Sequence, residues 1–342
     1  MFKGGKAVFL LMVLILGPTG LSQAACEMNK IASLPVTRHG SSIFVPVKIE
    51  GQELLFLIDT ASRHSWMLHA GADVLGKKVL LTTGGRQHDE IHFMTTRVGE
   101  ASIGLWGKKD FDIDVRDGPV NFGLPRAVGV LGLDVLSGFD VEFDVKGAQV
   151  NLFVPQGCEA ANLAYWSDSY NAVDMVRLSN SPEIFALAKV NGQDLIAGFR
   201  STITYSGLFQ DAAERVGVKP ESPGVIRVAE VAVAAGQTMT VWRASFDSFS
   251  LDQEVIKPAV LSFNGRVIKD RGGLRVTGER VARGGETYDM TIGADFIASH
   301  RILFSNSQRK IYFTYASGPP FFHVEGTLSD LAASALADQF AR

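Results

Sequence analysis

The segment Leu57-Ile58-Asp59-Thr60-Ala61-Ser62 places an acid directly after an apolar run and follows it with hydroxyl side chains. A carboxyl group held at the end of a buried strand can move a proton to or from a reacting molecule. One carboxyl supplies only one of the two proton transfers that an acid–base reaction requires. The chemistry of Asp59 therefore depends on which group faces it.

An internal repeat identifies the segment that would face Asp59. Gly51-Gln52-Glu53-Leu54 recurs as Gly192-Gln193-Asp194-Leu195, and the match continues without a gap beyond both loops. In this register Asp59 aligns with Arg200, so the chain presents two equivalent loops of which only the first carries an acid.

Length and composition describe a globular protein with two halves. A chain of 342 residues is long enough for two units that each bury a core. Hydrophobic residues make up 46 % and charged residues 20 % of the chain, which argues against disorder and against a membrane channel. A net charge of −3 gives no support for nucleic-acid binding, which requires a concentrated basic surface.

The N-terminus has the pattern of a secretory signal. Lys3 and Lys6 precede an apolar run over residues 7–16, and small residues follow it. Residues 1–24 are therefore predicted to be a signal peptide, which implies a periplasmic or secreted protein. No segment of the sequence is long and uniform enough to be a transmembrane helix.

Two cysteines, Cys26 and Cys158, are present in the chain. In an oxidising compartment we expect them to form a disulfide that closes the whole first half, although two free thiols are the alternative. Lipid attachment to Cys26 is a second alternative. Gln23, three residues before this cysteine, argues against it because it is a poor residue at that position of a lipidation site.

Apolar and β-branched runs dominate the chain, so the sequence predicts a mostly β protein. The strands that we expect are Ile43–Ile49, Glu53–Ile58, Asp140–Asp144, Gln149–Phe153, Arg301–Phe304 and Lys310–Tyr315. Helical signal is limited to short stretches at Gly71–Leu75, Leu133–Ser137 and Gln210–Val216.

The two halves also close with similar motifs, Gly132-Leu133-Asp134-Val135-Leu136 and Gly293-Ala294-Asp295-Phe296-Ile297. This organisation predicts a first lobe, an inter-lobe connection, a degenerate second lobe, and a tail with a short helix. Their boundaries are 26–157, 158–182, 183–318 and 319–342.

Together, the strand that runs into Asp-Thr-small-Ser and the two closing motifs resemble the aspartic peptidases, most closely the bacterial two-lobed, retropepsin-like members. The resemblance covers Ile31 to Phe313 and includes the placement of the two cysteines. It implies a two-lobed aspartic-peptidase fold made of tandem retropepsin-like β-barrel lobes. It also implies that Asp59 is catalytic and that Thr60, Ala61 and Ser62 form its supporting loop.

In such a site two carboxylates about 3 Å apart share a proton and supply the base and the acid together. The resemblance gives Thr60 the role of joining the loops through its hydroxyl, and Ser62 that of orienting the outer oxygen of Asp59. Arg200 stands at the position of the second catalytic aspartate. We expect a guanidinium there to hold Asp59 ionised well below the usual carboxylate range, which would remove the shared proton.

A hairpin around residues 82–96 corresponds to the segment that covers the substrate in the family, with Gly84, Gly85 and His88 as candidate contacts. His88 and His92 are four residues apart, a zinc-binding spacing on a helix. On a strand they would be roughly 13 Å apart, too far to share a metal. The sequence therefore predicts neither a metal nor another cofactor.

Three functions fit these observations. The first is a degenerate homologue, a pseudopeptidase that binds an extended polypeptide in a cleft between the lobes. The second is an active endopeptidase that uses Asp59. The third is a structural or partner-binding envelope protein. The intact first loop favours the first two, and Arg200 favours the first over the second.

Overall fold

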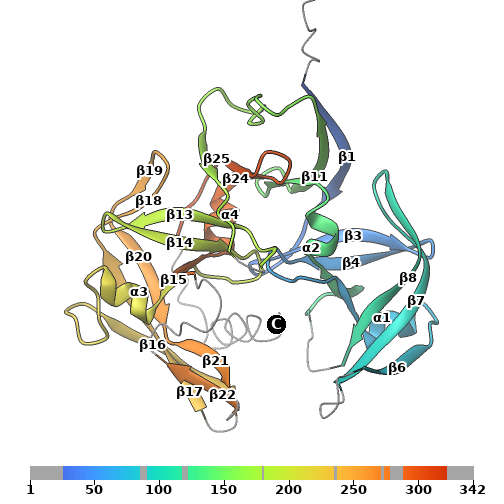
Figure 1. Ribbon diagram of the computed structural model, residues 1–342, viewed down its shortest axis with the longest axis horizontal. Helices are drawn as coiled ribbons and strands as arrows, with labels where there is room; N and C mark the ends of the chain where they lie inside the picture. Colours follow the sequence, from blue (N-terminus) through green and yellow to red (C-terminus); the bar gives the residue numbers. More distant parts are fainter. Residues whose placement is uncertain are drawn as a thin grey trace, which may run out of the picture.

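The computed structural model describes residues 26–84, 91–117, 122–178, 181–234, 237–270, 273–277 and 288–321. It shows two β-lobes side by side, joined by a sheet to which both contribute (Figure 1). The predicted signal peptide and the predicted C-terminal helix lie outside the described ranges, apart from residues 319–321 of the tail. Within these ranges, no helix combines the length and the hydrophobicity needed to cross a membrane.

The first lobe is an eight-stranded sheet with two short helices, α1 (His69–Val74) and α2 (Leu133–Leu136). Its strand order is β2 (Thr37–His39), β3 (Ser42–Ile49), β4 (Gln52–Ile58), β9 (Ala127–Leu131), β5 (Trp66–Leu68), β8 (Trp106–Arg116), β7 (Ile91–Ile103) and β6 (Val79–Gly84). β3 also pairs with β7, which curls the sheet onto itself.

The second lobe is a nine-stranded sheet with helices α3 (Gln210–Arg215) and α4 (Ala294–Ser299). Its strand order is β16 (Ile226–Ala234), β17 (Gln237–Phe246), β20 (Ala259–Asn264), β15 (Gly207–Phe209), β23 (Met290–Ile292), β14 (Gln193–Phe199), β13 (Phe185–Val190), β18 (Phe249–Leu251) and β19 (Glu254–Ile256). A separate hairpin contains β21 (Arg266–Asp270) and β22 (Gly273–Thr277).

The two lobes repeat one pairing scheme. β4 runs parallel to β9 in the first lobe, and β14 runs parallel to β23 in the second. β5 lies between an antiparallel and a parallel neighbour, as β15 does. The predicted class, mostly β with two tandem lobes and a few short helices, is confirmed. Within the described residues, the strands and helices that the sequence predicted are present, with boundary differences of a few residues.

A six-stranded sheet joins the lobes. Its order is β1 (Glu27–Pro35), β11 (Gln149–Gln156), β10 (Asp140–Asp144), β24 (His300–Ser305), β25 (Lys310–Tyr315) and β12 (Asn171–Asp174). The central pair, β10 and β24, brings one strand from each lobe into direct register. β12 lies inside the segment 158–182 that we predicted as a connection, so part of that segment is built into this sheet.

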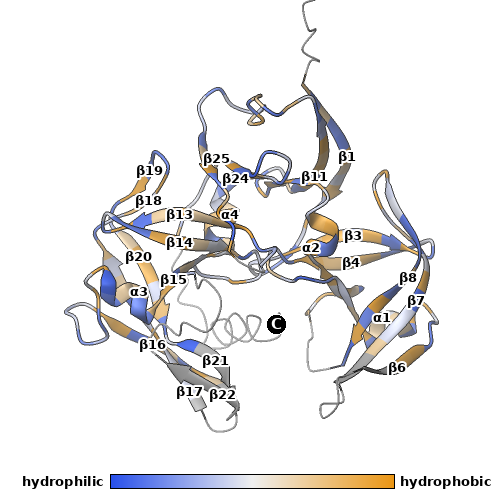
Figure 2. Ribbon diagram, viewed as in Figure 1, coloured by the Kyte–Doolittle hydropathy of each residue, from blue (hydrophilic) through white to orange (hydrophobic). Residues whose placement is uncertain are grey.

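One hydrophobic core runs through both lobes and into this sheet. Hydrophobic residues recur along the strands of both lobes (Figure 2). Alternation is clearest in β20, where every second side chain is buried. Phenylalanines fill much of the core, and aromatic contacts join the lobes: Phe304 packs edge-on against Phe143 and Phe199.

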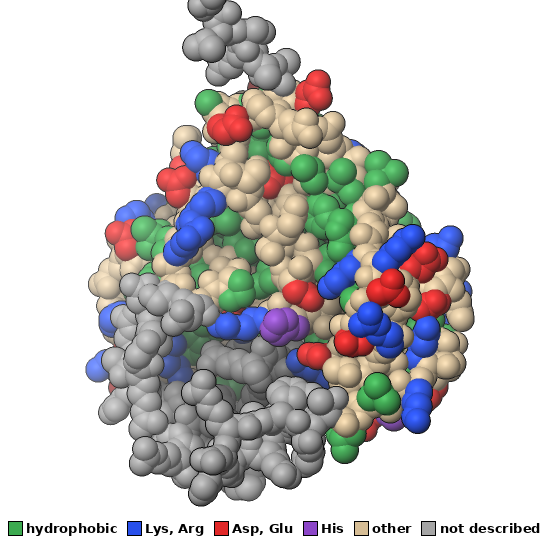
Figure 3. Space-filling model, turned by 45° about the vertical axis from the view of Figure 1, so that its right-hand side comes forward, with side chains coloured by type: hydrophobic (Ala, Val, Ile, Leu, Met, Phe, Trp, Pro, Cys, Tyr) green, Lys and Arg blue, Asp and Glu red, His purple; other side chains and the backbone are tan. Residues whose placement is uncertain are grey.

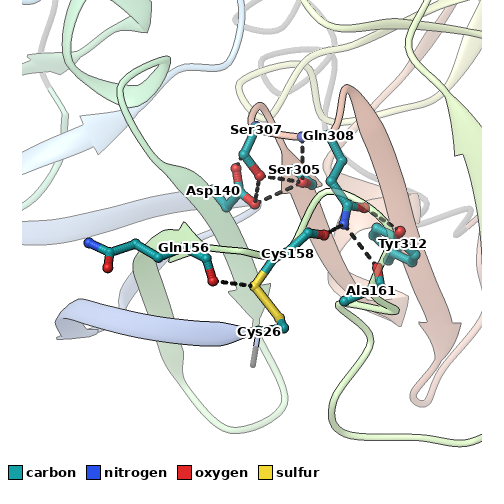
Figure 4. The surroundings of a disulfide bond; sticks show 9 residues. All are labelled: Cys26, Asp140, Gln156, Cys158, Ala161, Ser305, Ser307, Gln308 and Tyr312. Carbon is teal, nitrogen blue, oxygen red and sulfur yellow. Dashed lines mark hydrogen bonds between the residues drawn. A yellow bond between two sulfur atoms is a disulfide. The ribbon is translucent and has the colours of Figure 1, made fainter. Parts of the chain in front are cut away.

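The predicted disulfide between Cys26 and Cys158 is present and closes the first lobe. The second lobe contacts it through Gln308, whose side chain donates to the carbonyls of Cys158 and Ala161 (Figure 4). Tyr312 in turn donates to Gln308. The disulfide therefore lies against the β24–β25 turn rather than at a free end of the chain.

Candidate functional site

Asp59 and Arg200 lie on equivalent turns, each at the end of the second strand of a hairpin. The backbone N–H of Asp59 donates to the carbonyl of Leu131 at 3.0 Å, and that of Arg200 donates to the carbonyl of Ile292 at 2.9 Å. Both side chains are buried, with the residues 7 % and 3 % exposed. The backbone thus repeats closely at the point where the side chains differ in charge.

Hydroxyl groups join the two turns across the lobe boundary. Thr60 Oγ1 donates to the carbonyl of Phe199 at 2.8 Å, and Ser201 Oγ donates to the carbonyl of Ile58 at 2.7 Å. Each hydroxyl oxygen also accepts from the opposite backbone, Ser201 N–H at 3.0 Å and Thr60 N–H at 3.2 Å. Thr60 thus joins the loops through its hydroxyl, as the resemblance implied, and Ser201 is its counterpart.

Backbone amides hold the carboxyl of Asp59. Its Oδ1 accepts from the N–H groups of Ala61 at 2.8 Å and Ser62 at 3.1 Å. The hydroxyl of Ser62 donates to the carbonyl of His64 at 2.8 Å, so Ser62 supports Asp59 through its backbone, and its expected hydroxyl contact is wrong. Ala61 is buried and is not among the described residues with positive φ, so its methyl group fits the turn.

Two acids at equivalent positions, one in each lobe, accept hydrogen bonds from serines that follow the turns. Asp134 accepts from the N–H and the hydroxyl of Ser65, at 2.8 and 2.7 Å. Asp295 accepts from the N–H and the hydroxyl of Ser206, at 2.8 and 2.6 Å. Complete burial raises the pKa of Asp295 to about 7, despite these hydrogen bonds. These acids are the central residues of the two closing motifs, which explains why the motifs recur.

Arg200 forms an ion pair with Glu183, at 2.6 Å from Nη2 to Oε2. The guanidinium also lies over the ring of Tyr288, with Cζ 5.0 Å from the ring centroid. Both residues come from the second lobe, so this ion pair and this ring contact lie within one lobe, while the charge of Arg200 also interacts with that of Asp59. The sequence offered no signal for Glu183, because an acid just before a strand is ordinarily a solvated surface residue.

The protonation expected for Asp59 is wrong. Burial raises the pKa of Asp59 above its usual value, and this effect exceeds the lowering by the Ala61 and Ser62 amides and by the charge of Arg200. The charge of Glu183 also raises this pKa. The neutral carboxyl is therefore favoured more than in an exposed aspartate, which is the reverse of what Arg200 alone would cause.

The hairpin candidates are only partly placed. Gly84 is the last residue of β6, whereas Gly85 and His88 lie outside the described residues. His92 pairs with Thr83 in the β6–β7 ladder, which agrees with the hairpin interpretation. The described residues include no group of three or more His, Cys, Asp or Glu side chains that could hold a metal ion.

Side chains of both charges and a histidine lie at the surface where the lobes meet (Figure 3). One charged residue near Asp59 that sequence analysis missed is Arg116, at the end of β8. Its guanidinium Cζ is 4.6 Å from the ring centroid of Trp66, and its charge interacts with that of Asp59. A lone arginine at a strand end carries no motif, so only the fold reveals this proximity.

Comparisons with known proteins give structural neighbours alone. No family model matches the chain, and no curated protein matches it. A retropepsin-like aspartic protease from Rickettsia conorii is 18 % identical in sequence and superposes with a TM-score of 0.28. The match covers 38 % of this chain and 95 % of that protein. Basic 7S globulin from soybean is 13 % identical and superposes with a TM-score of 0.40. That match covers 85 % of this chain and 98 % of the globulin. At these TM-scores the likenesses carry no argument, so the site is interpreted from its own geometry.

Proposed function

We propose that this protein is an exported aspartic-peptidase homologue that binds an extended polypeptide between its lobes and has lost most or all proteolytic activity. The observation that carries the proposal is the pairing of Arg200 with Glu183 at the turn equivalent to that of Asp59. A turn built to bring a second carboxyl to the first instead holds a guanidinium.

Peptide binding is the part of the ancestral function that this arrangement would preserve. The hydroxyl bonds of Thr60 and Ser201 keep the two turns together, so the surface beside them stays organised without a catalytic pair. The β6–β7 hairpin offers backbone groups with which an extended chain can form hydrogen bonds. Binding through main-chain groups needs neither of the two carboxyls.

Catalysis by Asp59 alone is the second candidate. The raised pKa of Asp59 favours it, because a neutral carboxyl can donate a proton to a leaving group. Of the described acids near Asp59, Glu183 is bonded to Arg200 and is therefore poorly placed to act as the base. We therefore place binding first and weak endopeptidase activity second.

Export is the remaining part of the proposal. It rests on residues 1–24 as a signal peptide, and the disulfide between Cys26 and Cys158 fits an oxidising compartment. Fractionation of the cells that make the protein should recover the chain outside the cytoplasm without these residues. Recovery of the full-length chain in the cytoplasm would contradict this part.

The test of binding uses end-blocked random decapeptides that each carry a photoreactive benzophenone. After irradiation, mass spectrometry of the labelled mature protein locates the contact. We expect labels at the turns around Asp59 and Arg200 and on the β6–β7 and β16–β17 hairpins, together with intact peptide. No retained peptide, or labels confined to the six-stranded sheet, would refute binding between the lobes.

A further inference from the structure

Arg243 lies on β17, in the second lobe, and points away from the main core. Its neighbour Trp242 packs against that core, and successive side chains of a strand point to opposite faces of the sheet. Val241 lies on the same face as Arg243, in a small cluster against which Tyr205 packs. Because Tyr205 follows the Arg200 turn in the sequence, Arg243 shares a face of the sheet with the segment that leaves this turn.

The guanidinium of Arg243 is unpaired. Within the described part of the chain, its side chain forms no hydrogen bond or ion pair, and its Nε is buried without an acceptor. The residue as a whole is only partly buried, which leaves a route to the side chain. A buried donor without a partner is unfavourable, so a ligand oxygen that approaches this guanidinium would satisfy a group that the fold leaves unsatisfied.

Ser262 of β20 brings a second donor beside Arg243. The two residues are direct partners in the antiparallel β17–β20 ladder, so their side chains point to the same face. Ser262 is also partly buried, and its hydroxyl forms no hydrogen bond among the described residues. A guanidinium and a hydroxyl side by side can both donate to one carboxylate.

The first lobe fills the equivalent position with an aromatic side chain. Trp66 and Gly207 hold the same position in the internal repeat, and the ring of Trp66 packs against that of Phe122 at a centroid distance of 6.2 Å. Gly207 is the β15 partner of Ser262, and a Cβ on this glycine would lie 2.7 Å from the Ser262 carbonyl oxygen. This close backbone approach excludes a side chain there. Ser262 and Arg243 therefore lack the aromatic neighbour that Trp66 would supply.

Arg266, also in the second lobe, shows which ligand an arginine in this lobe binds. Its Nε and Nη2 donate to the two carboxylate oxygens of Asp211, at 2.7 and 3.2 Å. Arg243 has no such acid beside it in the sheet, because its partners on the two flanking strands are the uncharged residues Ile226 and Ser262. A carboxylate from outside the chain would give Arg243 the kind of partner that Arg266 has.

We propose that Arg243 and Ser262 form a subsite for an acidic peptide side chain, Asp or Glu, in the second lobe. The inference rests on the proposed function and adds a ligand class to it. The guanidinium would donate to both oxygens of the ligand carboxylate, as Arg266 does to Asp211, and the Ser262 hydroxyl would add a third hydrogen bond. The two residues determine specificity and take no part in catalysis.

The test compares two pools of end-blocked octapeptides built from uncharged residues, which differ in a single Glu or Gln per peptide. Binding to the mature protein at neutral pH is measured by competition with a fluorescent member of the Gln pool. We expect the Glu pool to bind about tenfold more tightly, the typical value of one charge-assisted hydrogen bond. The ratio should fall to about one in Arg243→Gln, while affinity for the Gln pool stays unchanged.

Three further variants locate the effect. Arg227→Gln removes an equal charge from an exposed ion pair with Glu230 on the neighbouring strand β16, and it should leave the ratio as in the wild type. Ser262→Ala removes a neutral donor and should lower the ratio about threefold. Arg243→Lys retains the charge without the planar fork, so its ratio should be intermediate.

Each result decides for or against the subsite. A wild-type ratio near one with both pools bound, an unchanged ratio in Arg243→Gln, or an equal fall in Arg227→Gln would overturn the subsite alone. If Arg243→Gln fails to fold, an unchanged ratio in both Arg243→Lys and Ser262→Ala would overturn it. Binding of neither pool would overturn the proposed function as well.

Discussion

The two turns at the centre of the molecule share a backbone and differ in chemistry. Asp59 and Arg200 donate to equivalent carbonyls, and Thr60 and Ser201 exchange equivalent hydrogen bonds. The first turn presents an acid that accepts hydrogen bonds from two backbone amides, whereas the second buries a cation paired with Glu183. The comparison shows that two turns with the same backbone hydrogen bonds can hold side chains of opposite charge.

The largest expected effect concerns the disulfide, which closes the first lobe and has no counterpart among the described residues of the second. Replacing Cys26 and Cys158 with Ser should lower the free energy of unfolding by about 4 kcal/mol, because a long loop gains entropy in the unfolded chain. Urea denaturation, with and without reductant, measures this. A reductant effect as large in the double variant as in the wild type would contradict the explanation.

The second effect tests whether Arg200 is a structural cation. Arg200→Ala leaves Glu183 half-buried without its partner and should cost about 3 kcal/mol in urea unfolding. The double variant Arg200→Met, Glu183→Gln removes both charges and should recover most of this loss. If the single variant loses less than about 1 kcal/mol, the ion pair is not what stabilises the second turn.

The third effect tests the equivalence of the hydroxyl groups. Thr60→Val and Ser201→Ala should each cost about 1 to 2 kcal/mol, because each leaves a buried carbonyl and an N–H group without a partner. The double variant should cost less than the sum, since the four bonds form one unit. Strict additivity in a double-mutant cycle would show that the turns are stabilised independently.

The smallest effect is a pH dependence of the protein's stability, which should distinguish Asp295 from Asp134. The pKa of Asp295 in the folded protein is raised from 3.8 to about 7, so the folded state binds a proton that the unfolded state has released. Stability should therefore fall as the pH rises from about 4 to 7 and level off above that range. Asp295→Asn should remove at least about 1 kcal/mol of this fall, measured by thermal unfolding at several pH values. Asp134→Asn is the matched control and should leave the fall in place.

The sequence predicted the strands and the equivalence of the two turns well, because both depend on local patterns of residues. Apolar runs set the strands, and the ungapped repeat aligned Asp59 with Arg200 before their turns were placed. It failed where a side chain's environment comes from distant segments. Glu183 and Arg116 carry no motif, and the pKa of Asp59 depends on burial and on where Arg200 directs its charge. The residue types alone therefore gave the wrong sign for that pKa.

The most direct test of the central claim is a cleavage assay on the mature protein and on Asp59→Asn. Both are incubated with an unfolded protein substrate and a peptide library between roughly pH 3 and 7, which spans the titration of carboxyl groups. With Arg200 and Glu183 in place of a second free carboxyl, we expect no cleavage by the wild type above the level of Asp59→Asn. Cleavage by the wild type that Asp59→Asn abolishes would contradict the account, because it would show that one aspartate suffices.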